Sequence, residues 1–352
     1  MPISRRNLLK TLGSTALIGS LFPGELFPQS SSKGFPYREP INIVIARNVS
    51  PFPGREYPDF SYRLTRAILE TLETHFGEEA MPVWGKPFPE VELEKRVTNI
   101  IHWVLRAVRQ YRDIYPVDPV WVMAQIMKES YFHEFAISAS LAVGICQLVQ
   151  STAQSHGLVV AGSKPAHGQP PFRLPEFAGK AGEYYRLRRE RRRYARANRP
   201  AKRFTLEEAL AALADGATPE VQRMAARQLS YRRRLTEYDR RIGQARDDFR
   251  EYLRANVEGR DIFNPADVAF LIRFDERFTY RKPVFAMVKM LAEALRARHG
   301  NVLAATAAYN AGLRSTADIG MYEPYGKIPF IEETVTHVSH VLINYHEIYS
   351  RL

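Results

Sequence analysis

Apolar residues recur at spacings of three and four along most of the chain, which is the period of one buried face of an α-helix. This pattern predicts helices over Phe60–Phe76, Val91–Tyr115, Asp118–Phe132 and Pro283–His299. The run Ile41–Ala46 (INIVIA) is the one strand signal, because it is short, apolar and rich in β-branched residues. The sequence therefore predicts a fold that is mainly α.

The middle of the chain shows a different helical pattern. From Val221 to Tyr252, apolar residues alternate at spacings of three and four in a heptad seam with one polar break. We expect a long helix from near Pro219 to Arg254, packed against the arginine-rich segment Glu176–Ala197, with a helix breaker at 198–200. The pattern predicts a helical hairpin inserted into the main domain.

Charge and composition narrow the choice of partners. The 352 residues are 45% hydrophobic, enough for a buried core, and carry a formal net charge of +12. Most of the surplus lies between Lys180 and Arg260, which contains 22 Lys and Arg but 12 Asp and Glu. The arginines of the insert, 176–254, form either a solvated outer face or a binding surface for an anionic polymer or a protein partner. No stacking platform or base-reading motif accompanies them, so we expect no nucleic acid partner.

The N-terminus resembles a twin-arginine export signal. Arg5 and Arg6 precede Thr11–Phe22, a weakly apolar stretch that is too short to be read as a membrane-spanning helix. The alternative interpretation is an amphipathic basic helix. We expect export into the periplasm, with membrane attachment only if the signal is uncleaved.

A glutamate near a helix end is the first candidate for chemistry. Asp118 can cap the helix that follows it, and Val122, Ile126 and Glu129 then share one face. A carboxyl group on an apolar face loses hydration, which raises its pKa toward the value that a general acid needs. The alternative is a last-turn glutamate that faces water. Glu134, five residues further along, is expected to be a solvated loop residue.

Two further segments offer groups that could contact a sugar. Residues 138–144 are mostly small and suit a turn that approaches a ligand closely, and a helix over Ile145–Ala153 is expected to carry Gln147 near its first turn. The segment Asn301–Gly312 (NVLAATAAYNAG) predicts an alanine-rich helix that ends with the Tyr-Asn pair 309–310 and a terminal glycine. The alternative for both segments is tight helix packing without a ligand.

Together these motifs resemble the catalytic domain of the soluble lytic transglycosylases, which are lysozyme-like enzymes that cleave peptidoglycan. The resemblance rests on Glu129–Ser130, on the small-residue turn that leads to Gln147, and on Ala308–Gly312 (AYNAG), in the family's order. It implies a goose-type lysozyme/transglycosylase fold interrupted by the helical hairpin. The expected divisions are a signal segment 1–27, an N-terminal extension 28–90, a lysozyme-like domain 91–160 and 261–352, and a basic helical insert 161–260.

The resemblance also implies a mechanism and a role for each site residue. In the family, one glutamate protonates the oxygen between N-acetylmuramic acid and N-acetylglucosamine, then acts as base on the muramic acid C6 hydroxyl, which closes a 1,6-anhydro ring. Neither a second carboxylate nor a metal or other cofactor is required. By position, Glu129 is the acid and base, and Ser130 orients it or the substrate. Gln147 lines the cleft, and Tyr309 and Asn310 form its opposing wall.

The chain departs from the family pattern at several positions. Leu141 stands where a glycine is usual, and Cys146 stands where a methionine is usual. As the only cysteine, Cys146 excludes an intramolecular disulfide and a cysteine-rich zinc site, and we expect it to be a packing residue. His337 falls in the place of a family tyrosine and is counted among the substrate-binding residues. Two alternatives stay open: a hydrolytic lysozyme on the same fold, and a non-catalytic peptidoglycan-binding or scaffold protein.

Overall fold

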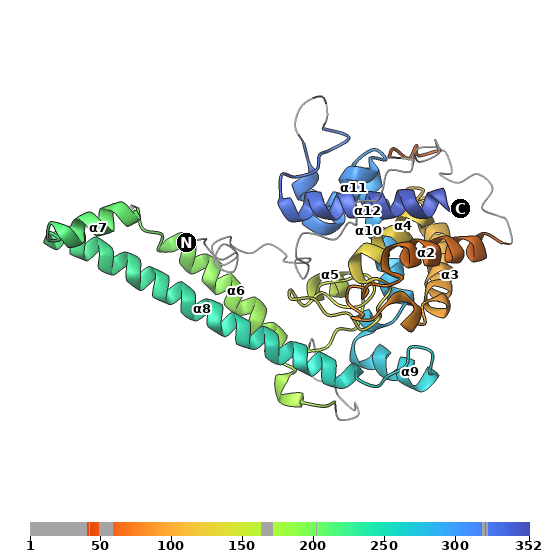
Figure 1. Cartoon of the computed structure of the whole chain (residues 1–352), viewed down its shortest axis with the longest axis horizontal. Coiled ribbons are helices and arrows are strands. Elements are labelled where there is room, and N and C mark those ends of the chain that lie inside the picture. Colours follow the sequence, from red (N-terminus) through yellow and green to blue (C-terminus); the bar gives the residue numbers. More distant parts are fainter. Residues whose placement is uncertain are drawn as a thin grey trace. The chain divides into compact units, whose positions relative to one another are not determined.

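The structure, a computed structural model, describes residues 41, 43–48, 59–162, 172–201, 203–318, 321 and 323–352. They divide into two compact units: residues 161–258 form one, and the chain before and after that segment forms the other. Helices dominate both units, and within these ranges no strand is longer than an isolated bridge (Figure 1). This confirms the predicted mainly α fold with its inserted helical hairpin. The predicted signal segment 1–27 lies outside the described residues.

The larger unit is a cluster of helices packed around one central helix, α4. In chain order its elements are α2 (Phe60–Phe76), η1 (Phe88–Glu90), α3 (Glu94–Tyr111), α4 (Pro119–Ser130), α5 (Gln150–Ser155), α9 (Pro265–Phe274), η3 (Glu276–Phe278), α10 (Arg281–Ala297), α11 (Val302–Ala311), η4 (Leu313–Thr316) and α12 (Glu332–Ser350). Helix α4 packs against α3 and α12, while α10 packs against α3 and α11. These contacts bring the two separated parts of the sequence into one core.

Helix α4 is buried on almost every side because its sequence is apolar around most of its circumference. Every residue from Pro119 to Met127 is buried. The Asp118 side chain caps the helix by accepting a 2.8 Å hydrogen bond from the backbone amide two residues on, and it also accepts a 2.8 Å hydrogen bond from the Tyr345 hydroxyl of α12. Burial and these two hydrogen bonds fix α4 in the core, and its last turn carries Glu129.

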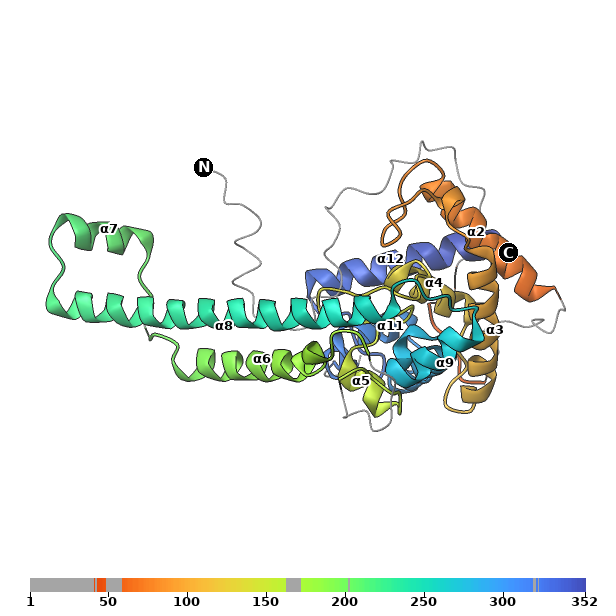
Figure 2. The same cartoon turned by 90° about the horizontal axis from the view of Figure 1, so that it is seen from below.

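The smaller unit contains the predicted hairpin. Its elements are η2 (Pro175–Phe177), α6 (Lys180–Ala197), α7 (Leu206–Ala214) and α8 (Pro219–Val257). Helices α6 and α8 lie side by side (Figures 1 and 2). Tyr194 of α6 stacks on Tyr231 of α8, with ring centroids 5.9 Å apart. The long helix expected from Pro219 is confirmed, whereas α7, which begins with a Thr205–Glu208 capping box, was not predicted.

Several predicted boundaries are wrong for local reasons. Helix α4 ends at Ser130, two residues early, because Tyr131 and Phe132 adopt left-handed φ angles of 49° and 62°. The predicted strand Ile41–Ala46 is absent from the described residues, where Val44 forms only an isolated bridge. A short apolar run cannot extend into a strand without a neighbouring strand to bond.

Candidate active site

Glu129 lies in the last turn of α4 and lines a pocket of about 350 Å³. Its side chain is only 4% exposed. Burial raises the pKa of Glu129 to about 7, and this effect outweighs the nearby Lys128 ammonium and a hydrogen bond from Gln125, both of which lower it. The carboxyl group is therefore protonated in a large fraction of molecules at neutral pH, as the sequence analysis expected for an acid on an apolar face.

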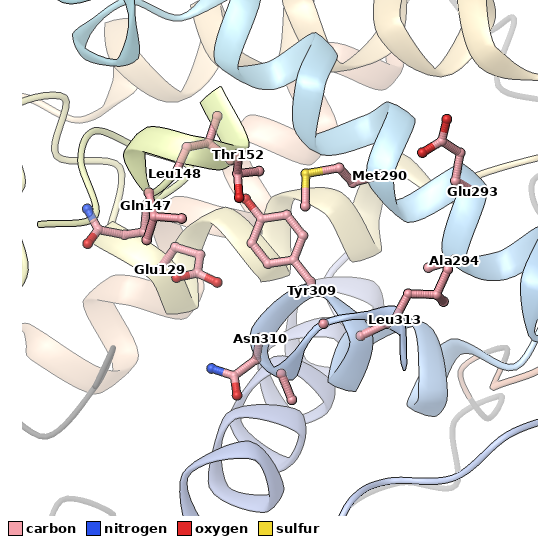
Figure 3. Close-up of a pocket in the computed structure, with 14 residues that line it drawn as sticks. Glu129, Gln147, Leu148, Thr152, Met290, Glu293, Ala294, Tyr309, Asn310 and Leu313 are labelled. Carbon is pink, nitrogen blue, oxygen red and sulfur yellow. The ribbon is translucent and has the colours of Figure 1, made fainter. Parts of the chain in front are cut away.

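The pocket has walls from three parts of the sequence (Figure 3). Helix α11 contributes Tyr309 and Asn310, and the loop before α5 contributes Gln147. Helix α10 adds Met290 and Glu293, which no sequence pattern predicted as pocket residues. Glu293 is 40% exposed and lies 3.9 Å from Lys289 of the same helix. A Lys-Glu pair four residues apart is typical of a solvated helix face, so the sequence gave no signal of a pocket residue.

Hydrogen bonds hold the α11 side of the pocket in place. The Tyr309 hydroxyl donates a 2.6 Å bond to the backbone carbonyl of Cys146, and burial raises the pKa of Tyr309 well above its ordinary value. The Asn310 Oδ1 accepts a 2.8 Å bond from the Thr334 hydroxyl of α12. Both residues of the Tyr-Asn pair are thus positioned by bonds to other elements.

Gln147 lies in a tight turn and not in a helix. Its φ angle is 45°, and α5 begins only at Gln150, so the predicted helix over Ile145–Ala153 is wrong. The side-chain amide Nε2 donates to the carbonyls of Gly144 (2.8 Å) and Ala136 (3.3 Å). We call residues 136–149 the glutamine loop, since this amide holds the loop closed beside Glu129.

A buried arginine holds the glutamine loop through hydrogen bonds to its backbone. Arg277, in η3, pairs with Asp275 at 2.7 Å and donates from Nη1 to the carbonyls of Leu141 (3.2 Å) and Leu148 (3.1 Å). At Gly144, with φ of 76°, a Cβ atom would lie 1.9 Å from the Arg277 carbonyl oxygen, so only glycine fits. The sequence gives no signal of this ion pair, because an Asp-Glu-Arg run at a helix end is typical of solvated charge.

Ser130 and His337 lie beside Glu129 but do not line the pocket. The Ser130 hydroxyl is fully buried and donates to the Ile145 carbonyl at 2.9 Å, tying the end of α4 to the glutamine loop. The His337 Nε2, on α12, lies 3.8 Å from the Glu129 Oε1. Burial, with help from the charge on Lys128, lowers the pKa of His337 to about 3, so its imidazole is neutral at physiological pH.

Two residues that raised questions in the sequence are packing residues here. Leu141 and Cys146 are 1% and 0% exposed and are not part of the pocket lining. Burial raises the pKa of Cys146 well above its ordinary value, which keeps the thiol protonated. The departures from the family pattern at these two positions therefore do not change the side chains that line the pocket.

The prediction that Glu134 is a solvated loop residue is wrong. Glu134 is 2% exposed, and both of its carboxylate oxygens accept 3.1 Å hydrogen bonds from the Arg96 Nε of α3. The partner lies 38 positions away, so no local pattern could reveal it. A buried charge with such a partner supports the turn after α4 rather than reacting with substrate.

Neither a metal site nor a membrane-spanning helix is found among the residues that the structure describes. No group of three or more His, Cys, Asp and Glu side chains is placed to hold a metal ion anywhere in the described part of the chain. None of the helices within the described residues is both long and apolar enough to cross a bilayer.

One comparison with known proteins gave a match. Residues 106–216 match the family described as Transglycosylase SLT domain, a segment that includes Glu129, Ser130 and Gln147 but less than half of the chain. Neither the search of curated proteins nor the search of solved structures produced a match. The match supports a transglycosylase domain that acts on peptidoglycan, in a lysozyme-like, all-α setting.

Proposed function

We propose that the protein is a peptidoglycan lytic transglycosylase in which Glu129 is the single acid and base. The observation that carries the proposal is the buried Glu129 carboxyl, 4% exposed, at the wall of the pocket, with its pKa raised to about 7. An acid with this pKa can donate a proton at neutral pH and afterwards accept one. The family match over 106–216 supports the same assignment.

The proposed reaction divides into two proton transfers. The Glu129 carboxyl gives its proton to the glycosidic oxygen, and the β-1,4 bond from C1 of N-acetylmuramic acid to N-acetylglucosamine breaks. The resulting carboxylate then takes the proton of the C6 hydroxyl while that oxygen bonds to C1. No water is consumed, and the product ends in 1,6-anhydro-N-acetylmuramic acid.

The other site residues are proposed to hold the sugar and the acid. Gln147, Tyr309 and Asn310 contact the glycan along the pocket, which all three line. Ser130 acts indirectly through the Ile145 carbonyl. His337 lies 3.8 Å from the Glu129 carboxyl, outside the pocket lining, and is proposed to help position this carboxyl as a neutral imidazole. The N-terminal Arg5–Arg6 pair supports export to the periplasm, where the substrate lies.

A second candidate function is hydrolysis by a lysozyme-type mechanism. The observation that favours it is Glu293, a second carboxyl group in the pocket lining. In Figure 3 the Tyr309 ring and Met290 lie between this carboxyl and Glu129. Glu293 is also 40% exposed and lies 3.9 Å from Lys289, whereas a base that activates water needs a position beside the sugar.

Mass spectrometry of digested peptidoglycan in heavy-oxygen water separates the two reactions. A transglycosylase releases anhydro ends that are lighter by one water and carry no heavy oxygen. A hydrolase releases reducing ends that carry it. Glu129→Gln should abolish both products and Glu293→Gln should leave the anhydro product. Equal lysis by wild-type protein and Glu129→Gln would instead indicate a contaminating activity and a non-catalytic wall-binding protein.

A further inference from the structure

Gln125 lies one turn before Glu129 on α4 and is fully buried. Its amide Nε2 is 3.0 Å from the Glu129 Oε1 and 2.8 Å from the His337 Nε2. One amide nitrogen thus bridges the candidate acid and the imidazole on α12. Gln125 is not in the pocket lining, so contact with substrate does not explain its position.

The chemistry of the three groups sets the direction of both hydrogen bonds. An amide nitrogen carries two hydrogens and no acceptor lone pair, so it donates to Glu129 and to His337. His337 can accept because burial lowers its pKa to about 3, which leaves the ring neutral, and a neutral ring with its proton on Nδ1 carries a lone pair on Nε2. The Glu129 Oε1 can accept whether the carboxyl is ionised or protonated on its other oxygen.

The opposite orientation of the Gln125 amide is less favourable. The carbonyl Oε1 of Gln125 is buried and has no hydrogen-bond partner among the described residues. Turning the amide by half a revolution would place the NH2 group, with two hydrogens, at that same unpartnered position. Two unsatisfied donors cost more than one unsatisfied carbonyl oxygen. The neutral His337 therefore accepts a hydrogen bond from the Gln125 amide, and this bond keeps the NH2 group of Gln125 toward Glu129.

We propose that Gln125, held by His337, is a positioning residue that directs the acid proton of Glu129 onto Oε2. Because the Gln125 amide already donates a hydrogen bond to Oε1, a proton on Oε1 would be repelled by the amide hydrogen. The Oε2 atom has no hydrogen-bond partner among the described residues and belongs to a side chain that lines the pocket. The proton thus sits on the oxygen that is free to meet the glycosidic oxygen. This inference rests on the proposed role of Glu129 as the acid.

Other charged and titratable groups also act on Glu129 and on its two neighbours, and they stay constant in the test. They are Lys128 on α4, Cys146 in the glutamine loop, Tyr309 on α11, and Glu333 and His340 on α12. A change confined to the Gln125 amide leaves these groups in place. Any difference in the titration of Glu129 between variants then reports on the hydrogen bond itself.

The test compares Gln125→Met, which keeps length and volume but removes the donor, with wild-type full-length protein. Initial rates on soluble glycan fragments are measured across pH. We expect kcat to fall by about twofold or more with KM little changed, because the proton is then shared between both oxygens and only one of them is free to meet the glycosidic oxygen. The fall of rate at alkaline pH should also move to higher pH, since loss of a donor to the carboxylate raises its pKa. Ile126→Leu, a volume-conserving change at a buried position of α4, is the packing control and should leave the pH profile in place.

A double-substitution cycle tests the part assigned to His337. His337→Phe removes the acceptor and should shift the profile in the same direction as Gln125→Met. The double variant should match Gln125→Met alone, because the two residues act in series. Fully additive effects would show that they act independently and would overturn the inference.

The remaining outcomes separate this inference from the proposed function. If Gln125→Met loses only thermal stability and keeps kcat and its pH profile, Gln125 is structural and the inference is wrong, while an inactive Glu129→Gln still supports the function. If wild-type protein cleaves no glycan, the function fails. NMR titration of the isotope-labelled Glu129 carboxyl then decides the hydrogen bond: a raised pKa in Gln125→Met supports it and an unchanged pKa overturns it.

Discussion

The Tyr309 hydroxyl and the Cys146 carbonyl are joined by a 2.6 Å hydrogen bond although they lie 163 positions apart in the chain. The bond connects α11, at one wall of the pocket, to the glutamine loop at the other. The loop is also held by the Gln147 amide and by Arg277. Glu129 thus stands beside a loop whose shape is set from three directions.

Tyr309→Phe should loosen the glutamine loop and lower activity. The substitution leaves the Cys146 carbonyl without its donor, which should destabilise the fold by about 1–2 kcal/mol. Glycan cleavage should fall more than stability alone explains, because the loop forms part of the pocket. Thermal unfolding and a turbidity assay on cell walls measure the two effects.

Tyr345→Phe is the matched control for that prediction. It removes a comparable hydroxyl, whose 2.8 Å hydrogen bond goes to Asp118 at the other end of α4. We expect a similar loss of stability and little loss of activity. If both variants lose activity in proportion to stability, the Tyr309 bond has no special relation to the site.

Glu129→Gln should inactivate the protein and yet stabilise it above neutral pH. The carboxyl ionises near pH 4.5 in the unfolded chain and near 7 in the fold, so the folded state holds an extra proton between these values. Its contribution to stability is therefore lost as pH rises from 4.5 through 7, by roughly 3 kcal/mol in total. The glutamine variant lacks this loss, so it should unfold at a higher temperature than wild type at pH 8 and at a similar temperature at pH 4.

Glu293→Gln supplies the comparison, because Glu293 lines the same pocket and is 40% exposed. Its unfolding temperature should follow that of wild type at both pH values. A Glu129→Gln variant that is equally or less stable than wild type at alkaline pH would show that the Glu129 carboxyl is not desolvated as the structure indicates.

The rate of glycan cleavage should fall as pH rises through about 7, because the acid must be protonated when the reaction starts. His337 does not contribute to this fall, since its pKa of about 3 keeps it neutral on both sides. Initial rates on soluble glycan fragments, measured across pH, give the profile. A rate that stays level well above neutral pH would contradict the assignment of Glu129 as the acid.

Local patterns predicted the helices better than the site. The helix Phe60–Phe76 matches its predicted bounds, because its apolar spacing records the face that it buries. The spacing of Glu129 likewise placed its carboxyl on a buried face. The loop conformation around Gln147 and the buried state of Glu134 were missed, because they depend on partners outside their own segment: Arg277 bonds the loop at Leu148, and Arg96 bonds Glu134. Periodicity reports burial of an element, whereas loop conformation depends on tertiary hydrogen bonds.

Leu141→Gly should destabilise the protein and leave substrate binding in the pocket nearly unchanged. Leu141 has a left-handed φ of 65°, which favours glycine by about 1 kcal/mol, so the substitution relieves some strain. It also removes a side chain that is 1% exposed, at a cost of about 2–5 kcal/mol. We expect a lower unfolding temperature and a nearly unchanged KM, since Leu141 does not line the pocket. A large rise in KM with little change in stability would place Leu141 in substrate binding.

Neutralising the arginines of α6 should weaken attachment to the cell wall. Arg189, Arg193 and Arg196 are exposed, recur at spacings of four and three, and form no ion pair among the described residues. If they bind an anionic polymer, changing all three to Gln should lower binding to purified walls and make the remaining binding less sensitive to salt. Cosedimentation at increasing salt concentrations measures both effects.

The charge change itself is controlled by Arg63→Gln, Arg109→Gln and Arg296→Gln, three exposed arginines outside the hairpin. This triple variant has the same net charge as the α6 variant, so a non-specific charge effect would weaken binding equally in both. A selective loss in the α6 variant, with cleavage of soluble fragments retained, would assign wall attachment to the hairpin. Unchanged binding, together with unchanged product length after deletion of 176–254, would leave its arginines as a solvated surface.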